Sequence, residues 1–219
     1  MNIYISIFLL ALTSCTTAQK LTLPSLPPPN KPKYDALELK VYLNKLSIAV
    51  QERDTEKLKK LMIPDIKLTL GPESDKPPEE ILELANSNSW AWKELETILQ
   101  LGGTFRGPNN FGIPYTFTKF PRDIEAYSHQ VLIKPFVIAR NKPNKNASKV
   151  AILEFAIVRH KLGTPKTIVG IDGTRWIEIY LNGTVAYIPQ EAARSPIDFR
   201  AGFEKRKTGW IMTTFLAGD

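Results

Sequence analysis

The chain has 219 residues, of which 43% are hydrophobic and 10% aromatic, and this composition excludes wholesale disorder. It carries 29 Lys and Arg against 22 Asp and Glu, a net charge of +7, and its one cysteine excludes an internal disulfide and a cysteine-rich zinc site. The length allows one large domain or two small ones. All of the excess positive charge follows residue 129, which indicates an anionic neighbour such as lipid headgroups, wall polymers or acidic peptides; solubility is the alternative explanation.

The chain begins with an apolar run, Ile3 to Leu12, that ends in the sequence LTSC. Ten residues are too few to span about 30 Å of hydrocarbon as a helix, but they match the apolar region of a signal peptide. The LTSC ending resembles the bacterial lipobox, in which the signal is cut before a cysteine that becomes lipid-modified. This resemblance implies a signal peptide over 1–14, lipidation of Cys15, and an address in the bacterial cell envelope. The alternatives are an ordinary secretory signal with an incidental cysteine, or a free core thiol.

Within the envelope, the outer membrane on its periplasmic side is expected. The residue after the cysteine, Thr16, is not the Asp that often retains lipoproteins at the inner membrane. Residues 15–33 then contain five prolines, which prevent regular helix or sheet and favour an extended tether. At about 3.1 Å per residue such a tether reaches roughly 60 Å. The membrane is therefore an expected partner, reached through the N-terminal lipid.

Helical signals dominate the next part of the chain, 34–125. Apolar residues at three- and four-residue spacing predict a helix from Tyr34 to about Val50. Asp54 is expected to cap a short second helix, Pro78 to open a third, and a fourth is expected to end at Gly102. One half-buried strand is predicted near residues 65–71. The sequence therefore predicts a mainly helical α+β domain over 34–125.

Residues 104–121 break this pattern, because aromatic side chains alternate there with Gly and Pro and make a regular helix improbable. The aromatic residues are Phe105, Phe111, Tyr115, Phe117 and Phe120. They could line a ligand groove. The favoured interpretation is that they hold a long connection against a core.

From residue 130 onward the chain is rich in Val, Ile and Tyr, which predicts strands. The clearest signal is RWIEIYLNGTVAYIP, where Asn182-Gly183 suits a two-residue type I′ turn between two strands. With that register Leu181 faces Thr184, and Glu178 faces Tyr187. A second hairpin is expected over 197–219, with its turn in the sequence KRKTG and with Phe199, Phe203, Trp210 and Phe215 as apolar anchors.

The order of motifs from VIARNKPNKNASKVAIL to WIEIYLNGTVAYIP resembles the bacterial Src-homology-3 (SH3b) domain. The matching residues are Arg140, Pro143, Ser148, Val150, Trp176, Ile179, Gly183, Tyr187 and Ile188. The chain's ending is also similar to that of uncharacterised bacterial lipoproteins in which such a barrel follows a helical α+β region. The resemblance implies a small five- to six-stranded SH3-like barrel over 130–196, followed by the C-terminal β-hairpin over 197–219.

In the SH3b family the barrel often binds peptidoglycan or peptide segments through aromatic side chains and variable loops. The resemblance therefore implies Trp176, Tyr180, Tyr187 and Arg140 as candidate ligand-binding residues. On a strand Trp176, Glu178 and Tyr180 share one face, and the sequence does not tell whether that face meets a ligand or the core. The alternative is that these aromatic residues are scaffold.

The chain offers no support for catalysis, so no catalytic residue, metal site or cofactor is predicted. A cysteine peptidase needs a thiolate beside a base, and the only cysteine is the expected lipid acceptor. His129 and His160 form neither an HxxxH nor an HExxH pair, and no GxSxG elbow occurs. The carboxylates of Glu79, Glu80 and their neighbours are better explained as solvated helix charges than as a glycosidase pair.

The sequence thus predicts a non-catalytic, lipid-anchored envelope protein that binds or scaffolds through an SH3-type barrel. The expected ligand is peptidoglycan or a peptide of an envelope protein, and nucleic acid is not expected for an exported protein. One alternative is a small-ligand carrier or an enzyme with its site in the aromatic segment 104–121. Another is a structural accessory of assembly.

Overall fold

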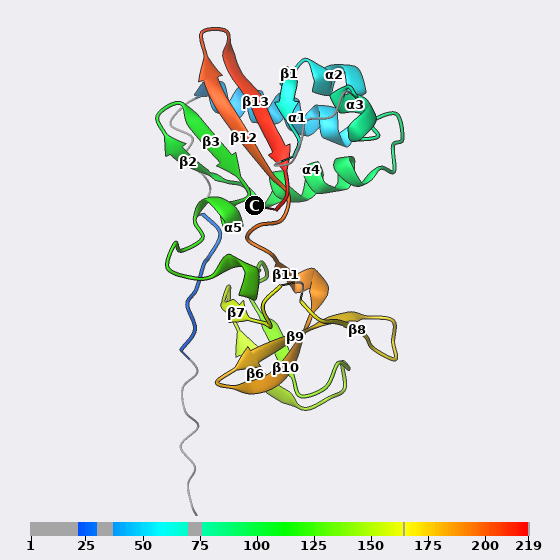
Figure 1. The fold of residues 1–219 in the computed structure, drawn as a ribbon, viewed down its shortest axis with the longest axis vertical. Coiled ribbons are helices and arrows are strands. Elements are labelled where there is room, and N and C mark those ends of the chain that lie inside the picture. The colour runs from blue at the N-terminus through cyan, green and yellow to red at the C-terminus, as the bar shows by residue number, and fades with distance from the viewer. Residues whose placement is uncertain (1–21, 30–36, 70–75, 164, 219) are drawn as a thin grey trace, which may run out of the picture.

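The computed structural model describes residues 22–29, 37–69, 76–163 and 165–218, which form two β-sheet domains (Figure 1). Of the described residues, 36% lie in strands and 25% in helices. The prediction of a mainly helical N-terminal domain is therefore wrong. Local periodicity identified the helices, but the sheet they cover is completed by strands from the far end of the chain.

The first domain contains the helices that the sequence predicted. They are α1 (Leu37–Gln51), α2 (Thr55–Lys59), α3 (Pro78–Ile81) and α4 (Trp90–Leu101). The Asp54 carboxylate accepts a hydrogen bond from the Lys57 backbone N–H at 2.9 Å, which confirms the predicted cap of α2. Gly102 ends α4 with a φ of 67°, a conformation that glycine adopts without a steric penalty.

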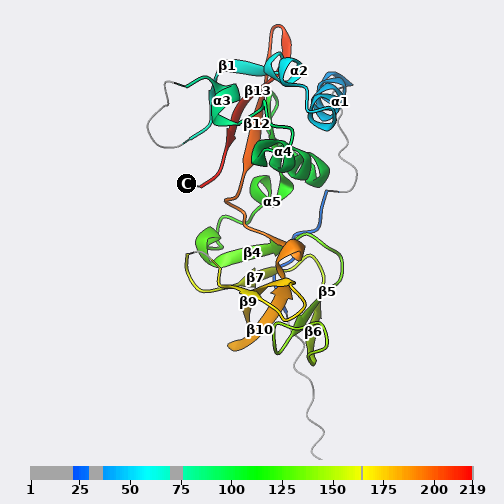
Figure 2. The same cartoon turned by 90° about the vertical axis from the view of Figure 1, so that its right-hand side faces the viewer.

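The sheet of the first domain has five strands in the order β1-β13-β12-β3-β2. They are β1 (Met62–Lys67), β2 (Thr104–Gly107), β3 (Asn110–Ile113), β12 (Arg200–Arg206) and β13 (Gly209–Leu216). The C-terminal hairpin thus supplies two of the three inner strands, pairing antiparallel with β3 and parallel with β1. Figure 2 shows α1 and α4 together on one side of this sheet.

The apolar side chains of the hairpin explain why it lies there. Phe203, Met212 and Phe215 are almost fully buried in the same cluster as the apolar faces of α1 and α4. The ring of Tyr42 from α1 meets the Phe203 ring edge-on at 5.7 Å. The hairpin therefore belongs to the core of the first domain.

Residues 104–121 are more regular than their composition indicated. They form the antiparallel pair β2–β3 and then the short helix α5 (Tyr115–Thr118), so the expectation of an irregular connection is wrong here. A β-turn at Pro108-Asn109 joins the two strands, a hairpin signal that the sequence analysis did not use.

The second domain lies between α5 and β12 in the sequence and contains eight strands. They are β4 (His129–Leu132), β5 (Val137–Arg140), β6 (Lys149–Leu153), β7 (Ile157–Arg159), β8 (Thr167–Val169), β9 (Arg175–Leu181), β10 (Thr184–Pro189) and β11 (Ala193–Arg194). Short 3₁₀ turns, η1 (Ala126–Ser128) and η2 (Gln190–Ala192), precede β4 and β11.

These strands pair in the order β11-β4-β7-β9-β10-β5-β6, with β8 added to β9. The two end strands, β6 and β11, do not pair with each other in the described part of the chain, so the sheet stays open and the predicted closed barrel is wrong. The physical reason lies in the two end strands of this order. The strand β11 has only two residues and pairs with β4 at one end, whereas β6 pairs with β5 at the other end.

The Asn182-Gly183 hairpin is confirmed. Both turn residues have positive φ, 49° and 78°, as a type I′ turn requires. Leu181 pairs with Thr184, and Glu178 pairs with Tyr187, as the register predicted.

Residues 22–29 of the proline-rich segment lie against the second domain. The Leu26 backbone N–H donates to the Phe155 carbonyl at 2.7 Å, and the Ile157 N–H donates to the Pro24 carbonyl at the same distance. The Leu26 side chain is buried beside Val131 and Ile157. This part of the expected tether is therefore held by the domain.

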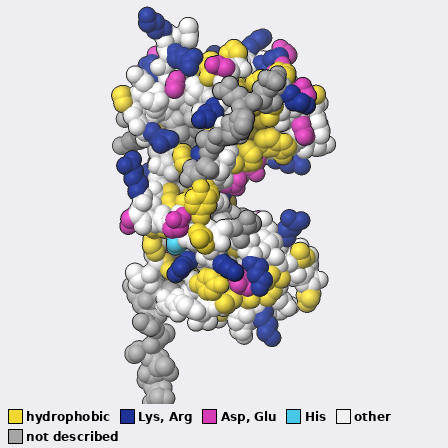
Figure 3. Space-filling view, in the orientation of Figure 1, with side chains coloured by type: hydrophobic (Ala, Val, Ile, Leu, Met, Phe, Trp, Pro, Cys, Tyr) yellow, Lys and Arg dark blue, Asp and Glu magenta, His cyan; other side chains and the backbone are white. Residues whose placement is uncertain are grey.

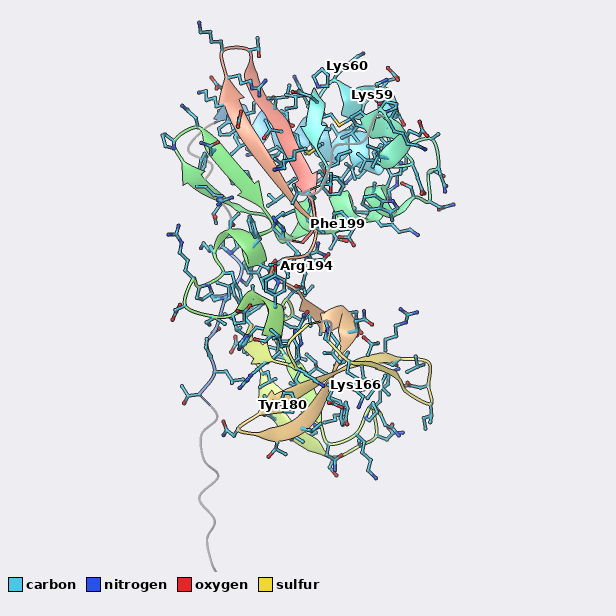
Figure 4. All side chains as sticks on the ribbon, in the orientation of Figure 1. Lys59, Lys60, Lys166, Tyr180, Arg194 and Phe199 are labelled. Atoms are coloured by element: carbon cyan, nitrogen blue, oxygen red, sulfur yellow. The ribbon has the colours of Figure 1, made fainter. Side chains whose placement is uncertain are left out.

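The two domains meet around a buried ion pair and a small apolar cluster. Arg194 donates to the Glu94 carboxylate on α4 at 2.9 Å and to the Phe199 carbonyl at 3.0 Å, where the chain passes between the domains (Figure 4). Tyr115 of the first domain packs with Val131, Ile157 and Leu26. Because the Arg194 side chain is only 6% exposed, removal of Glu94 would leave its charge buried without that partner. Such a change costs more stability than breaking a surface ion pair does.

A buried histidine makes the stability of the second domain depend on pH. Burial lowers the pKa of His160 below its usual value, and the hydrogen bond with the Lys161 carbonyl offsets this shift only in part. Since an unfolded histidine titrates near pH 6.5, the unfolded state binds the extra proton first as the pH falls. We expect the free energy of unfolding to decrease between about pH 7.5 and pH 5.5, measured by urea titration with second-domain fluorescence.

The variant His160→Gln should show a flatter profile over this pH range, whereas His129→Gln should keep most of the decrease. His129 is the appropriate control because it is more exposed and lies near the same edge of the sheet. Identical pH profiles for wild type and His160→Gln would contradict the assignment.

Candidate functional site

The two faces of β9 differ in burial, and this difference settles which side chains belong to the core. Ile177, Ile179 and Leu181 are buried in the apolar cluster of the second domain. Because side chains alternate along a strand, Glu178 and Tyr180 lie on the opposite face, where both are partly exposed. We call this opposite side of the sheet its outer face.

Trp176 lies on the outer face but is only 1% exposed. Its strand neighbours are Pro189 on β10 and Ile168 on β8. The backbone at Gly170 comes so near that a Cβ there would lie 2.9 Å from the indole Nε1 and 2.7 Å from the Pro143 carbonyl oxygen. The loops at Gly170 and Pro143 therefore cover the ring. Trp176 packs beneath these loops, so its ring is not accessible to a ligand.

Two other candidate residues, Arg140 and Tyr187, lie in a row that crosses three strands, and Tyr180 lies two positions along β9 from Glu178 of that row. Tyr187 on β10 pairs with Arg140 on β5 at one side and with Glu178 on β9 at the other. The Glu178 carboxylate accepts hydrogen bonds from the Lys166 ammonium at 2.9 Å and from the Tyr187 hydroxyl at 3.5 Å. We call Arg140, Tyr187, Glu178 and Lys166 the cross-strand row.

Two members of this row were not predicted as site residues. Lys166 precedes β8, and its carbonyl accepts the Glu178 backbone N–H at 3.1 Å, which continues the strand pairing and brings the two side chains together. The predicted register already paired Glu178 with Tyr187, so alternation could have placed Glu178 in the site. Nothing in the sequence pairs residue 166 with residue 178.

The electrostatics of the row keep Lys166 charged. The hydrogen bond to Glu178 raises the pKa of Lys166, and the nearby Tyr187 and Tyr180 hydroxyls act in the same direction. The Glu178 side chain is 16% exposed, whereas that of Lys166 is 65% exposed. The carboxylate is thus held under the cation, and solvent weakens their attraction on the ammonium side.

Arg140 has a structural contact as well as its place in the row. Its guanidinium donates to the Ala147 carbonyl at 2.6 Å, which ties the β5–β6 loop to the strand. A guanidinium has five N–H donors, so this bond uses a minority of them. Arg140 can therefore hold the loop and contact a ligand at the same time.

Apolar side chains surround the row on the outer face. Tyr180 pairs with Val185, and Ile138 pairs with Ile152, of which Val185 is 39% and Ile152 65% exposed. Figure 3 shows basic side chains around a hydrophobic area on the second domain, and Figure 4 places Tyr180 and Lys166 in that area. The outer face thus combines aromatic, apolar and charged groups, as peptide- and sugar-binding surfaces do.

The rival site in residues 104–121 is a groove and not an enclosed apolar cavity. Phe111 and Tyr115 are buried in cores, and Phe105 is partly exposed against the Phe111 and Trp210 rings. Phe111 and Phe117 are the aromatic residues of this segment that line a groove of about 510 Å³ on the first sheet, together with charged side chains. The aromatic segment therefore mostly packs, as favoured from the sequence.

The described residues do not gather groups for metal catalysis. Within them no cluster of three or more His, Cys, Asp or Glu side chains could hold a metal ion. His129 Nδ1 lies 2.7 Å from the Glu125 carbonyl oxygen, and His160 Nδ1 lies 2.6 Å from the Lys161 carbonyl oxygen. Each ring is thus tied to a nearby backbone carbonyl.

Cys15 and the predicted signal peptide, 1–14, lie outside the described residues, so the structure does not place the predicted lipid acceptor. No helix in the described ranges combines the length and the hydropathy needed to cross a membrane. Comparisons of the chain with protein-family models, with curated proteins and with solved structures found no match.

Proposed function

We propose that this chain is a non-catalytic, lipid-anchored protein of the bacterial cell envelope that binds its ligand on the outer face of the second sheet. The single observation that carries the proposal is the cross-strand row beside Tyr180. The second domain, 126–196, holds ten Lys and Arg against four Asp and Glu, so its field attracts anionic ligands.

The ligand that suits this surface is the peptide-bearing polymer peptidoglycan. Its stem peptides carry carboxylates, which match the guanidinium of Arg140 and the ammonium of Lys166. Glu178 adds an acceptor for N–H groups, and the Tyr180 and Tyr187 rings offer flat apolar area at low entropic cost. The SH3b resemblance, which rests on sequence motifs, favours the same ligand class.

The contact of residues 22–29 with the second domain limits how far that domain can lie from the membrane. If Cys15 carries lipid, six residues lie between it and Thr22, and the seven residue steps from Cys15 to Thr22 span at most about 25 Å when fully extended. The second domain would then stay close to the bilayer, and the first domain would lie farther along the chain's path. The part of the tether between the lipid and the second domain would thus be shorter than the roughly 60 Å expected for the whole of residues 15–33.

Cosedimentation with purified, protein-free peptidoglycan tests the binding proposal. We expect the wild-type chain to be retained at low salt and more weakly at high salt, because ionic contacts are screened. Tyr180→Ala should reduce retention at least fivefold by removing stacking area. Tyr127→Ala is the matched control, since Tyr127 is another tyrosine of the second domain but lies in η1 and not on β9 or β10, and this variant should bind as wild type does.

Equal binding by wild type and Tyr180→Ala would contradict the site, and absence of retention at both salt concentrations would contradict the ligand. A parallel pull-down from envelope extract distinguishes a protein partner. Capture of one envelope protein through the same row, without peptidoglycan, would move the proposal to a peptide ligand.

A further inference from the structure

A second row of directly paired side chains crosses the outer face of the second sheet beside the cross-strand row. Arg159 on β7 pairs with His129 on β4 at one side and with Tyr180 on β9 at the other. Tyr180 in turn pairs with Val185 on β10. Because directly paired residues of antiparallel strands project from the same face, all four side chains lie on the outer face. We call His129, Arg159, Tyr180 and Val185 the second row.

The burial of its neighbours shows that Arg159 is open to a ligand. Val158, the residue before it, is buried in the apolar cluster of the second domain, so Arg159 projects the opposite way and is exposed. Ile157 shares the face of Arg159 but is buried with Tyr115 of the first domain. The first domain therefore covers the outer face as far as Ile157 and leaves Arg159 accessible at this border.

The outer face carries unbalanced positive charge at two places. Among the described residues, the Arg159 side chain makes no hydrogen bond or ion pair. Arg140 donates to the Ala147 carbonyl, which is neutral and leaves the charge of Arg140 unbalanced. It also lies directly opposite Lys149 on β6, and like charges in that position destabilise a sheet unless an anion lies between them. Lys166, in contrast, is balanced by Glu178.

The strand register gives the separation of these two places. The path from Arg140 to Arg159 crosses from β5 to β10, from β10 to β9 and from β9 to β7, and it shifts by two residues along β9 between Glu178 and Tyr180. With strands about 4.8 Å apart and a rise of about 3.4 Å per residue, the two backbone positions lie roughly 16 Å apart. An extended peptide covers that distance in about five residues. One ligand chain can therefore reach both arginines, and it would pass over Tyr187 and Tyr180.

We propose that Arg159 binds a second carboxylate of the ligand, so that the outer face recognises an extended peptide with two acidic groups about five residues apart. This inference rests on the proposed function and names the feature of the peptide that the surface recognises. A guanidinium binds a carboxylate through two parallel hydrogen bonds, and an amide in the same position offers one acceptor oxygen and no charge. The surface therefore distinguishes peptides with free carboxylates from amidated ones.

Cosedimentation of the full-length chain with two forms of one peptidoglycan preparation tests the inference. Both forms are purified free of protein and of phosphate-containing polymers, and in the second the free carboxylates have been converted to amides. We expect wild type to bind the amidated form at least tenfold more weakly. Arg159→Gln, a change at an exposed position, should weaken binding to the untreated form at least fivefold. On the amidated form it should differ from wild type less than twofold, because the group that Arg159 binds is missing there.

Arg175→Gln is the matched control. Arg175 is an exposed arginine on β9, the strand of Tyr180, but alternation places it on the opposite face. Its replacement removes the same charge and should change binding less than twofold. Equal retention of wild type and Arg159→Gln, equal losses in the two variants, or an Arg159→Gln loss that persists on the amidated form would each overturn the second-carboxylate assignment while the first row still binds. Absence of wild-type retention on untreated peptidoglycan would contradict the proposed function itself, and this inference with it.

Discussion

Removal of residues 197–219 is expected to unfold the first domain while the second sheet remains paired. The truncation deletes β12 and β13, so β1 loses its only strand partner and β3 loses one of its two partners in the described sheet. It also exposes the core side chains of α1 and α4, which pack on Phe203, Met212 and Phe215. Truncation of one such large core side chain to alanine typically costs about 2–5 kcal/mol, so the loss of several together is comparable to the 5–15 kcal/mol that typically stabilises a domain.

Hydrogen exchange measures this result by domain. Amides of α4 should lose their protection, and those of β9 and β10 should keep most of it. The point variant Phe203→Ala tests the same core more gently and should lower the free energy of unfolding by about 3–5 kcal/mol. Lys207→Ala, at the exposed hairpin turn, should stay within about 0.5 kcal/mol of wild type. Retained protection of α4 in the truncated chain would show that the hairpin is dispensable.

Cys15→Ala is expected to release the protein from membranes and to abolish lipid labelling. The thiol is the acceptor of the acyl-glycerol group in the lipobox reaction, and alanine has no nucleophile to replace it. The expected change is large because lipid chains contribute about 0.8 kcal/mol per buried CH₂ to membrane binding. Carbonate extraction and metabolic labelling with a fatty-acid analogue measure it.

Ser14→Ala is the matched control, since it keeps a small residue before the cysteine and should leave both labelling and fractionation unchanged. Unchanged membrane retention of Cys15→Ala would contradict lipid anchoring. If labelling is lost while retention persists, the second domain itself must bind an envelope component strongly enough to hold the protein there.

The features that could be predicted from the sequence depend on neighbours along the chain. The Asp54 cap, the end of α4 at Gly102 and the Asn182-Gly183 turn each follow from the conformational preferences of one or two residues. The register of the β9–β10 hairpin follows from its turn. Such signals stay valid whatever the rest of the fold does.

The features that could not be predicted depend on contacts between distant segments. The sequence marked Phe203 as an apolar anchor of the C-terminal hairpin, but it could not show that β3, more than eighty residues earlier, is the strand beside β12. Likewise, Trp176 and Tyr180 are both aromatic, so the sequence predicted both as candidate ligand-binding residues. Only the covering loops at Gly170 and Pro143 separate the buried tryptophan from the partly exposed tyrosine.

The open second sheet has a similar cause. The motifs that resemble SH3b domains lie in β5, β6, β9 and β10, and these strands pair as neighbours. Closure depends instead on the end strands β6 and β11, whose pairing no local motif specifies. Pro24 and Leu26 add a further interaction, because their backbones form hydrogen bonds with Ile157, the first residue of β7, and with Phe155.

The most direct test of the central claim, that the outer face of the second sheet binds peptidoglycan, is an NMR titration with soluble peptidoglycan fragments. The proposal predicts chemical-shift changes that saturate together at the amides of Arg140, Glu178, Tyr180 and Tyr187, with β12 and β13 unaffected. Absence of changes at these four amides, or changes confined to the first domain, would contradict it.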